Sequence, residues 1–579
     1  MKTLKKALCL VLASVFLSAN AMAYNIGDVI GTILSTDIVT YVDFMPTVSY
    51  NIAGRTAIIA QRLTDFGLDV VFDEATRVLT ISKGSGVAST YSVPTSTSSL
   101  PVGTPVGKVL YTDITTNFEG THIDSFNIGG LTCIYADDFA KLYGTYVWDE
   151  DNRTVHVTKS GYSAPSVSKK SAQRQLGSSQ LEATRDNALA RWGSPEKSSL
   201  IPNSDGTFYT LEAADFINIE KYDSSFNLIS SNSLPYELPI FGDFHSGSEY
   251  NYIVFGQENN SQDNSREVLR LVIYDKNFVK LREVSINNCK TTVPFDASNC
   301  SIAENDSYLM IHTARSQYAD ANGNRPQTQL SVIIDKNGWK QCNLLGQFQS
   351  NHTSHALNGF VKAQDDRFIT LDLSDAAPSR GLILRAIDFS GNVFGEQNIY
   401  PVGGNSGANC TGVMTGGLEI TPTGYLAAMN AIDPTIATNY LNTFIEGAEY
   451  ENRDILLLWA KKDTWETKLT RLAKYSGSGY TAGVPKLVLL SGGNYAVLWS
   501  VFANSNEQSS HYATEVCYAI VDASGNQIGG VKTLPNAILS DDCQPVVSGE
   551  NVIWFVNTHS GRDFYSFTPG SARQTVDGI

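Results

Sequence analysis

Hydrophobic and polar positions along residues 206–567 recur as one unit: an aromatic-led apolar run, a loop, a second apolar run, and a turn that opens on aspartate. Short apolar runs bounded by Asp, Asn and Gly are typical of β-strands joined by tight turns. The leading runs begin near Phe208, Tyr252, Tyr308, Phe368, Tyr425, Tyr495 and Val552. The turn aspartates are Asp223, Asp275, Asp335, Asp388 and Asp522, with a degenerate copy at Asp463.

This recurrence predicts a mostly β chain whose residues 181–579 form a β-propeller. Turn intervals of roughly 50 to 75 residues suit a propeller repeat that carries loop insertions. Seven leading runs favour seven blades, with six or eight as alternatives, and a series of β-sandwiches is the competing interpretation. The last unit, residues 551–567, is short of strands. Because a propeller commonly closes by combining both ends of its chain, we expect residues 189–200 to complete that blade.

A different pattern occupies the N-terminal part, where residues 31–83 repeat without gaps at an offset of 76. Residues 51–54 return as 127–130, and residues 72–74 return as 148–150. Each copy predicts a hairpin around Asp-Glu-x-x-Arg, preceded by a short helix. The apolar residues at helical spacing are Ile59, Leu63 and Phe66 in the first copy and Tyr135, Phe139 and Leu142 in the second. We therefore expect two small α/β modules, each with one helix on an antiparallel sheet, at residues 24–84 and 106–160.

The module pattern, Asn-x-x-Gly-Arg-Thr followed by Val-Phe-Asp-Glu-x-x-Arg-x-Leu-x-Ile, resembles the copper amine oxidase N-terminal-like (stalk) domain of secreted bacterial proteins. The second copy has Leu131 where the first has Arg55. The first copy carries the motif in Asn51, Gly54, Arg55, Thr56, Asp73 and Arg77. The resemblance covers about 130 residues and implies a spacer or surface-binding module.

The same resemblance argues against amine oxidase activity. In that family the chemistry belongs to a separate domain, with a cofactor tyrosine in Asn-Tyr-Asp/Glu and a His-x-His copper pair, and neither motif occurs here. We expect no cofactor. The whole layout, tandem stalk modules before a strand-repeat region, resembles that of uncharacterised secreted bacterial proteins.

The chain begins with the pattern of a signal peptide. Lys2, Lys5 and Lys6 precede an apolar run at residues 7–17, and residues 21–23 read Ala-Met-Ala, a small-x-small cleavage site. We expect residues 1–23 to be removed and the mature protein to be extracellular or cell-wall-associated. No later run approaches the ~18 apolar residues of a membrane span.

The composition argues against one class of binding partner. The net charge is −16, and no basic run is present, so a nucleic-acid partner is not expected. Residues 85–105, rich in Ser, Thr and Pro, and residues 161–180, rich in Ser, predict solvated linkers. After processing, seven scattered cysteines remain, and such an odd number does not suggest a disulfide framework.

Candidate ligand-binding residues are polar side chains near the ends of the leading runs, where propeller strands approach the central channel. These are Gln257, His312, Asp372, Asn430, Ser500 and Asn557. His355, three residues after His352, is a further candidate. His352, His355 and His312 raise the question of zinc, but no Glu-bearing helix accompanies them and we predict no metal site. Gly-x-Ser-x-Gly, phosphate-binding Gly-rich loops and Cys-x-x-Cys are missing.

Two functions fit this sequence, beside a third possibility, a purely structural surface-layer component that self-associates without a ligand and that the sequence does not separate from the first. The first is a non-catalytic binding or scaffold protein that presents a propeller on stalk modules to cell-wall glycan or an extracellular protein. The alternative is an extracellular carbohydrate-active lyase or hydrolase that uses carboxylates and histidines of the propeller funnel. Carboxylate pairs such as Asp365-Asp366 and Asp541-Asp542 leave that alternative open.

Overall fold

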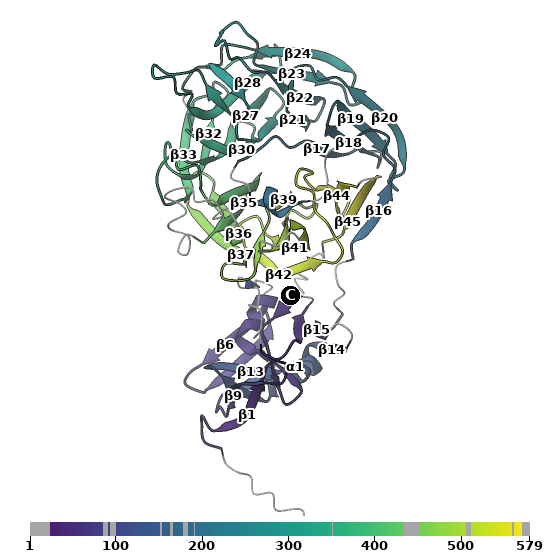
Figure 1. The fold of residues 1–579 in the computed structure, drawn as a ribbon, viewed down its shortest axis with the longest axis vertical. Coiled ribbons are helices and arrows are strands. Elements are labelled where there is room, and N and C mark those ends of the chain that lie inside the picture. Colours follow the sequence, from purple (N-terminus) through teal and green to yellow (C-terminus); the bar gives the residue numbers. More distant parts are fainter. Residues whose placement is uncertain are drawn as a thin grey trace, which may run out of the picture.

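The strands form an N-terminal body, residues 24–160, and a ring of sheets, residues 168–567 (Figure 1). The computed structural model describes residues 24–569 except 44, 85–90, 93–99, 151–152, 162–165, 178–182, 190–191, 350, 434–451, 505–510 and 559–560. The predicted signal peptide and much of the two predicted linkers lie outside the described residues. No helix in the described part of the chain has the length and apolar character needed to cross a membrane.

The body is built from both sequence copies at once. Its closed barrel has the order β1 (Val29–Leu34), β4 (Ser49–Ile52), β5 (Arg55–Ile59), β13 (Leu131–Tyr135), β12 (Ser125–Ile128) and β9 (Pro105–Leu110). One outer sheet is β11 (Thr121–Ile123), β10 (Thr115–Phe118), β7 (Val78–Lys83) and β6 (Leu68–Asp73). The other is β14 (Gly144–Asp149), β15 (Thr154–Lys159), β2 (Val39–Val42) and β3 (Met45–Thr47).

The two copies exchange strands, which corrects the expectation of two separate antiparallel modules. β7 of the first copy pairs in parallel with β10 of the second, and β15 of the second pairs in parallel with β2 of the first. The buried core is likewise shared, since Leu79 and Ile81 pack in the same cluster as Phe118 and Phe139. Neither copy contains all the partners that its own strands need, and the result is one interleaved body.

The two predicted helices form, but they differ in type. The first copy has the 3₁₀ helix η1 (Ala60–Phe66), and the second has the α-helix α1 (Ala136–Tyr143). Gly67 ends η1 in the left-handed region, at φ 81°, a conformation that glycine adopts without steric cost. Asp137 and Asp138 lie in the first turn of α1, where negative charge stabilises the helix dipole.

Seven sheets make up the described part of the ring. In chain order the first two are β17 (Ser198–Pro202), β18 (Phe208–Ala213), β19 (Ile217–Tyr222) and β20 (Leu228–Leu234), and β21 (Ile240–Ser246), β22 (Asn251–Gly256), β23 (Leu269–Tyr274) and β24 (Lys280–Ile286). The third is β25 (Thr291–Pro294) and β26 (Cys300–Glu304), which both pair with β27 (Tyr308–Gln317), then β28 (Gln327–Asp335) and β29 (Lys340–Gln341). The fourth is β30 (Ala356–Ala363), β31 (Phe368–Ser374), β32 (Gly381–Ile387) and β33 (Val393–Pro401).

The last three sheets complete the circle. The fifth is β34 (Val413–Ile420), β35 (Gly424–Ile432), β36 (Arg453–Lys461) and β37 (Thr467–Lys474), joined by β8 (Tyr91–Ser92). The sixth is β38 (Tyr480–Ala482) and β39 (Lys486–Leu489), both paired with β40 (Tyr495–Ala503), then β41 (Ala513–Val521) and β42 (Gln527–Leu534). The seventh is β43 (Val546–Ser548), β44 (Asn551–Asn557), β45 (Arg562–Phe567) and β16 (Ser168–Ala172).

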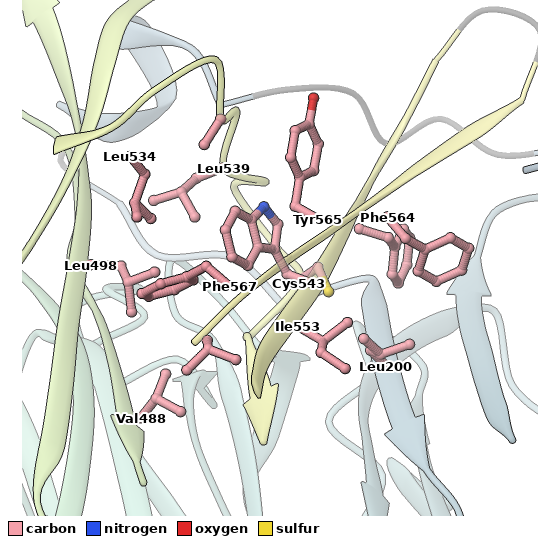
Figure 2. Close-up of a cluster of buried hydrophobic side chains, with 14 of the residues drawn as sticks. Leu200, Val488, Leu498, Leu534, Leu539, Cys543, Ile553, Phe564, Tyr565 and Phe567 are labelled. Atoms are coloured by element: carbon pink, nitrogen blue, oxygen red, sulfur yellow. The ribbon is translucent and has the colours of Figure 1, made fainter. Parts of the chain in front are cut away.

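The seventh sheet is completed by β16, which pairs with β45 from the other end of the chain. The prediction that residues 189–200 do this is wrong, because Leu200 belongs to β17 and pairs within the first sheet. The segment predicted as a linker, residues 161–180, therefore supplies a strand. Figure 2 shows the apolar cluster at this junction, where Leu200, Leu498 and Phe564 come from three different sheets.

The predicted aspartate turns join the third and fourth strands of the sheets. At four of these turns the carboxylate oxygen of the aspartate accepts hydrogen bonds from backbone N–H groups two and four residues later, as Asp223 does from Ser225 and Asn227, both at 2.8 Å. Asp388 and Asp522 repeat the geometry. Asp335 accepts only the first of the two hydrogen bonds, from the Asn337 N–H. Such turns satisfy their own backbone donors, which explains why this residue opens them.

The body contacts the ring beside β42. Met45 of β3 is buried in a ring cluster with Trp499 and Val531, and the Thr533 hydroxyl donates a hydrogen bond to the Met45 sulfur over 3.1 Å. The short strand β8 extends the fifth sheet by pairing in parallel with the end of β37. The N-terminal part is thus attached to the ring at two places.

Candidate functional site

The innermost strands, among them β17, β30 and β39, surround the centre of the ring (Figure 1). A cavity of about 210 Å³ lies between some of these strands. Strands β30, β34, β39 and β40 line it, together with the segment that precedes β17 and the loop that precedes β43. Its charged lining residues are Glu196, Lys486, Asp541 and Asp542.

The segment before β17 (the crossing segment, residues 183–189 and 192–196, with α2 at Arg185–Ala188) forms one wall. It is held by several sheets: the Leu189 carbonyl accepts from the Arg453 guanidinium at 2.9 Å, and the Gly193 N–H donates to the Ala297 carbonyl at 3.1 Å. A Cβ at position 193 would lie 1.6 Å from the Asn358 side-chain oxygen, so only glycine permits this approach.

Three carboxylates from two chain segments meet in this cavity. The Asp541 carboxylate accepts a hydrogen bond from the Asn187 amide at 2.7 Å, and the Asp542 carboxylate accepts one from the Lys197 backbone N–H at 3.1 Å. Burial is the largest influence on both groups and raises the pKa of each. Burial also raises the pKa of Glu196, although 41% of its side chain is exposed, because that exposed part lines the cavity.

Lys486 is the one basic residue in the lining, and it is 6% exposed. Its ammonium group donates to the backbone carbonyl of Asp541 at 2.6 Å and lies 3.9 Å from a Glu196 carboxylate oxygen. Asp243 of β21, which does not line the cavity, has a pKa well above its usual value, first because of burial and second because of the negative charge of Glu196. The fully ionised lining carries more negative than positive charge.

Two buried hydroxyls also face the cavity without a hydrogen-bond partner among the described residues. The Thr415 side chain of β34 and the Ser500 side chain of β40 are 2% and 3% exposed, and each lines the cavity. A buried hydroxyl without a partner is costly, so both positions suit a bound polar group or water. At the rim Trp192 remains 39% exposed, and the amides of Asn299 and Asn358 complete the lining.

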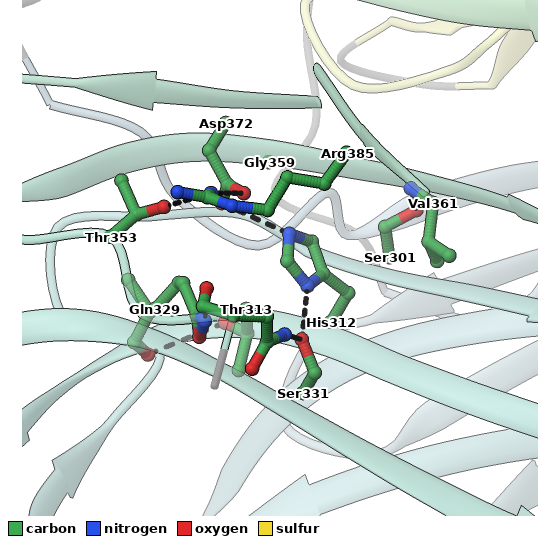
Figure 3. Close-up of polar contacts among 12 residues, drawn as sticks. Ser301, His312, Thr313, Gln329, Ser331, Thr353, Gly359, Val361, Asp372 and Arg385 are labelled. Atoms are coloured by element: carbon green, nitrogen blue, oxygen red, sulfur yellow. Dashed lines mark hydrogen bonds and ion pairs between the residues drawn. The ribbon is translucent and has the colours of Figure 1, made fainter. Parts of the chain in front are cut away.

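Most of the predicted ligand-binding residues lie elsewhere. His312 and Asp372 are buried between the third and fourth sheets, where the histidine Nε2 lies 3.0 Å from the carboxylate and the other ring nitrogen 2.8 Å from the Ser331 hydroxyl. Arg385 forms an ion pair with Asp372 at 3.3 Å (Figure 3). These groups satisfy one another, and none lines the cavity.

The remaining predicted residues also lie outside the cavity, and most of them form hydrogen bonds within or between sheets. Asn430 donates to the Ala482 carbonyl, and Asn557 contacts Glu212 and Arg562 across the first and seventh sheets. The Gln257 amide donates to the Glu267 carbonyl at 2.9 Å, and His355 lies in the loop before β30. Ser500, also named from the sequence, is the exception because it reaches the cavity.

Most of the predicted residues lie away from the cavity because of the strand to which they belong. The aromatic-led runs form the second strand of each sheet, not the innermost strand, so their polar side chains pack between neighbouring sheets. The innermost strands have a less regular apolar pattern, so the sequence does not single them out. Of the groups that the sequence reasoning missed, Asp541-Asp542 was visible as a carboxylate pair, whereas nothing local distinguishes Glu196, Trp192 or Lys486.

Metal and thiol chemistry gain no support at this site. Within the described residues no three His, Cys, Asp or Glu side chains are grouped to hold a metal ion, and His352 and His312 are not part of such a group. The seven described cysteines are free thiols, and six of them are buried.

Comparisons with known proteins leave the chain without a family. No protein-family model matches the sequence, and no curated protein matches it. Among solved structures the chain is similar to a GH43 endo-arabinanase from Bacillus licheniformis, with 11% identity over 48% of this chain and 97% of that chain and a TM-score of 0.25. At that score the similarity carries no argument about function.

Proposed function

We propose that this chain is an exported glycan-binding protein whose seven sheets are the blades of one closed propeller and whose central cavity receives the glycan. The N-terminal body then acts as the stalk that holds the propeller at the cell envelope, in keeping with the resemblance of its two copies to stalk domains. The predicted signal peptide supplies the route of export.

The composition of the cavity carries this proposal. Carboxylates, amides and two hydroxyls without partners among the described residues line it, and an exposed indole stands at its rim. A sugar presents hydroxyls that exchange hydrogen bonds with the first set and an apolar C–H face that packs on an aromatic ring. Pockets of this kind use a few placed polar groups for specificity.

Binding of the full chain to a panel of soluble oligosaccharides, measured by calorimetry, tests the proposal. We expect saturable binding to at least one member and, in Trp192→Ala, a several-fold loss of affinity, because aromatic contacts contribute about 0.5–1.5 kcal/mol. Phe216→Ala is the matched control, since Phe216 is 54% exposed and does not line the cavity. Equal losses in the two variants, or no binding to any member, would count against a glycan site in the cavity.

Glycan cleavage is the second candidate, and the clustered carboxyls favour it. Burial raises the pKa of Glu196, Asp541 and Asp542, and a raised pKa suits a carboxyl to the role of a general acid. Release of reducing ends from a polysaccharide panel, abolished by Asp541→Asn or Asp542→Asn, is the expected signature. Binding without any product would leave the non-catalytic function as the only one of the two.

A further inference from the structure

Among the described residues, the charged groups that line the cavity do not balance one another. Glu196, Asp541 and Asp542 face the single ammonium of Lys486, so the fully ionised lining carries a net charge of −2. The Lys486 ammonium donates to backbone carbonyls, including that of Asp541, and its nearest carboxylate is that of Glu196 at 3.9 Å. The Asp541 and Asp542 carboxylates accept hydrogen bonds from a neutral amide and a backbone N–H.

Other charged groups near the three carboxylates do not remove the imbalance. Lys197 lowers the pKa of Asp542, but burial outweighs it, and Asp243, close enough to Glu196 for the Glu196 charge to raise its pKa, supplies no positive charge. A bound cation inside such a site gains Coulomb energy that water would otherwise screen. The low-dielectric setting that makes the carboxylates costly in the free protein is the same setting that favours a positively charged ligand.

An independent observation indicates what else the ligand carries. Ser500 and Thr415 are at least nine-tenths buried, line the same cavity and have hydroxyls without partners among the described residues. A hydroxyl can donate and accept, which matches the hydroxyls of a sugar ring. The exposed Trp192 indole at the rim can pack on such a ring and also attract a nearby ammonium group.

We infer that the cavity recognises an amino sugar with a free primary amine, a de-N-acetylated glycan segment, through Glu196, Asp541 and Asp542. This inference rests on the proposed glycan-binding function and gives its ligand class. A compact metal ion is a poorer match, because no three acidic, histidine or cysteine side chains in the described residues are grouped closely enough to coordinate one.

The test compares two oligosaccharides that differ only in the amine. The full chain is titrated by calorimetry with a β-1,4-linked glucosamine oligomer and with the N-acetylated oligomer of equal length. We expect the free-amine oligomer to bind at least about tenfold more tightly, which corresponds to one well-placed charge contact. The preference should weaken as salt is added, and it should fall at low pH, where the carboxylates are protonated, and at high pH, where the amine loses its proton.

Variants separate the charge effect from the fold. The double variant Asp541→Asn, Asp542→Asn should lose the preference for the free amine while it keeps the affinity for the N-acetylated oligomer. Asp306→Asn removes one negative charge at an exposed position outside the cavity and should leave the preference intact. Thermal unfolding of each variant shows whether it is folded, and if the double variant is not, Glu196→Gln provides the same readout.

Each outcome decides the amine inference, the glycan-binding proposal, or both. Equal binding of the two oligomers overturns the amine inference and leaves the glycan-binding proposal standing. No binding of these oligomers or of any panel member overturns both. Binding of a lysine-containing peptide as tight as that of the free-amine oligomer, with no response to neutral sugars, overturns the glycan assignment and assigns the cavity to a protein ligand.

Discussion

The N-terminal body and the ring are both assembled from repeated units, but they bury those units in different ways. In the body, each of the three sheets contains strands from both copies, and the main core cluster is shared between them. In the ring, consecutive strands pair with one another, and the sheets exchange only β16 and β8 with distant segments. Repetition in sequence therefore does not imply independence in structure.

The difference has an energetic consequence. A unit that pairs mainly within itself gains most of its backbone hydrogen bonds locally and adds interface energy from its neighbours. A unit whose strands are completed by its twin gains little until both are present. We expect the body to fold as one cooperative unit and the ring to be most sensitive where its first and last sheets meet.

We expect the largest effect on folding when the N-terminal body is divided between its two copies. A fragment of residues 24–84 should be unfolded, because β2 and β7 lose β15 and β10 and the barrel loses half of its strands. A fragment of residues 24–160 should fold. Far-ultraviolet circular dichroism and amide dispersion in NMR spectra distinguish the two, and a cooperative melting transition in the shorter fragment would contradict strand exchange.

The junction of the first and seventh sheets should be the next most sensitive point. Arg562 is 1% exposed and forms ion pairs with Glu212 and Glu220, so Arg562→Ala leaves two buried carboxylates without their partner. We expect a loss of about 3–5 kcal/mol in the free energy of unfolding.

Urea unfolding followed by tryptophan fluorescence measures this loss, since of the seven tryptophans all but Trp148 lie in the ring. Arg367→Ala is the control: Arg367 pairs with Asp366, which is 62% exposed, and such surface pairs contribute at most about 1 kcal/mol. Similar losses in the two variants would mean that the junction does not limit the stability of the ring.

A smaller effect sharpens the distinction between buried network and cavity. His312→Ala removes the contacts to Asp372 and Ser331 between the third and fourth sheets, and we expect a loss of about 1–3 kcal/mol in ring stability. Affinity for any ligand of the cavity should stay unchanged, because His312 does not line it. If His312→Ala lowered the affinity for the ligand and left the stability of the ring unchanged, His312 would belong to the binding site after all.

The smallest effect tests the symmetry of the body. The exposed pairs Arg77–Asp113 and Arg153–Asp37 occupy equivalent positions in the two halves, at 2.6 and 2.7 Å. Arg77→Ala and Arg153→Ala should each lower the stability of the body only slightly and by nearly the same amount, because exposed ion pairs contribute little. Thermal unfolding of the residue 24–160 fragment provides the comparison, and a large difference between the two would show that the halves are not energetically equivalent.

Much of the local structure could be predicted from the sequence, and the site could not. The duplication at an offset of 76, the aspartate turns and the recurring strands all appear where the pattern placed them. The ligand site was sought on the second strands, because their aromatic-led pattern is the strongest. The cavity of the proposed site gathers Glu196, Lys486 and Asp541 from segments with no common pattern.

The sequence by itself determined the features that short-range forces hold: the hairpins, their turn aspartates, the two helices and the repeat boundaries. These depend on side-chain period and on hydrogen bonds between residues a few positions apart. Only the tertiary structure decided which strand completes which sheet, because an open sheet edge offers the same backbone groups to any partner. It also decided which carboxylates share one cavity, since that depends on the closure of the ring.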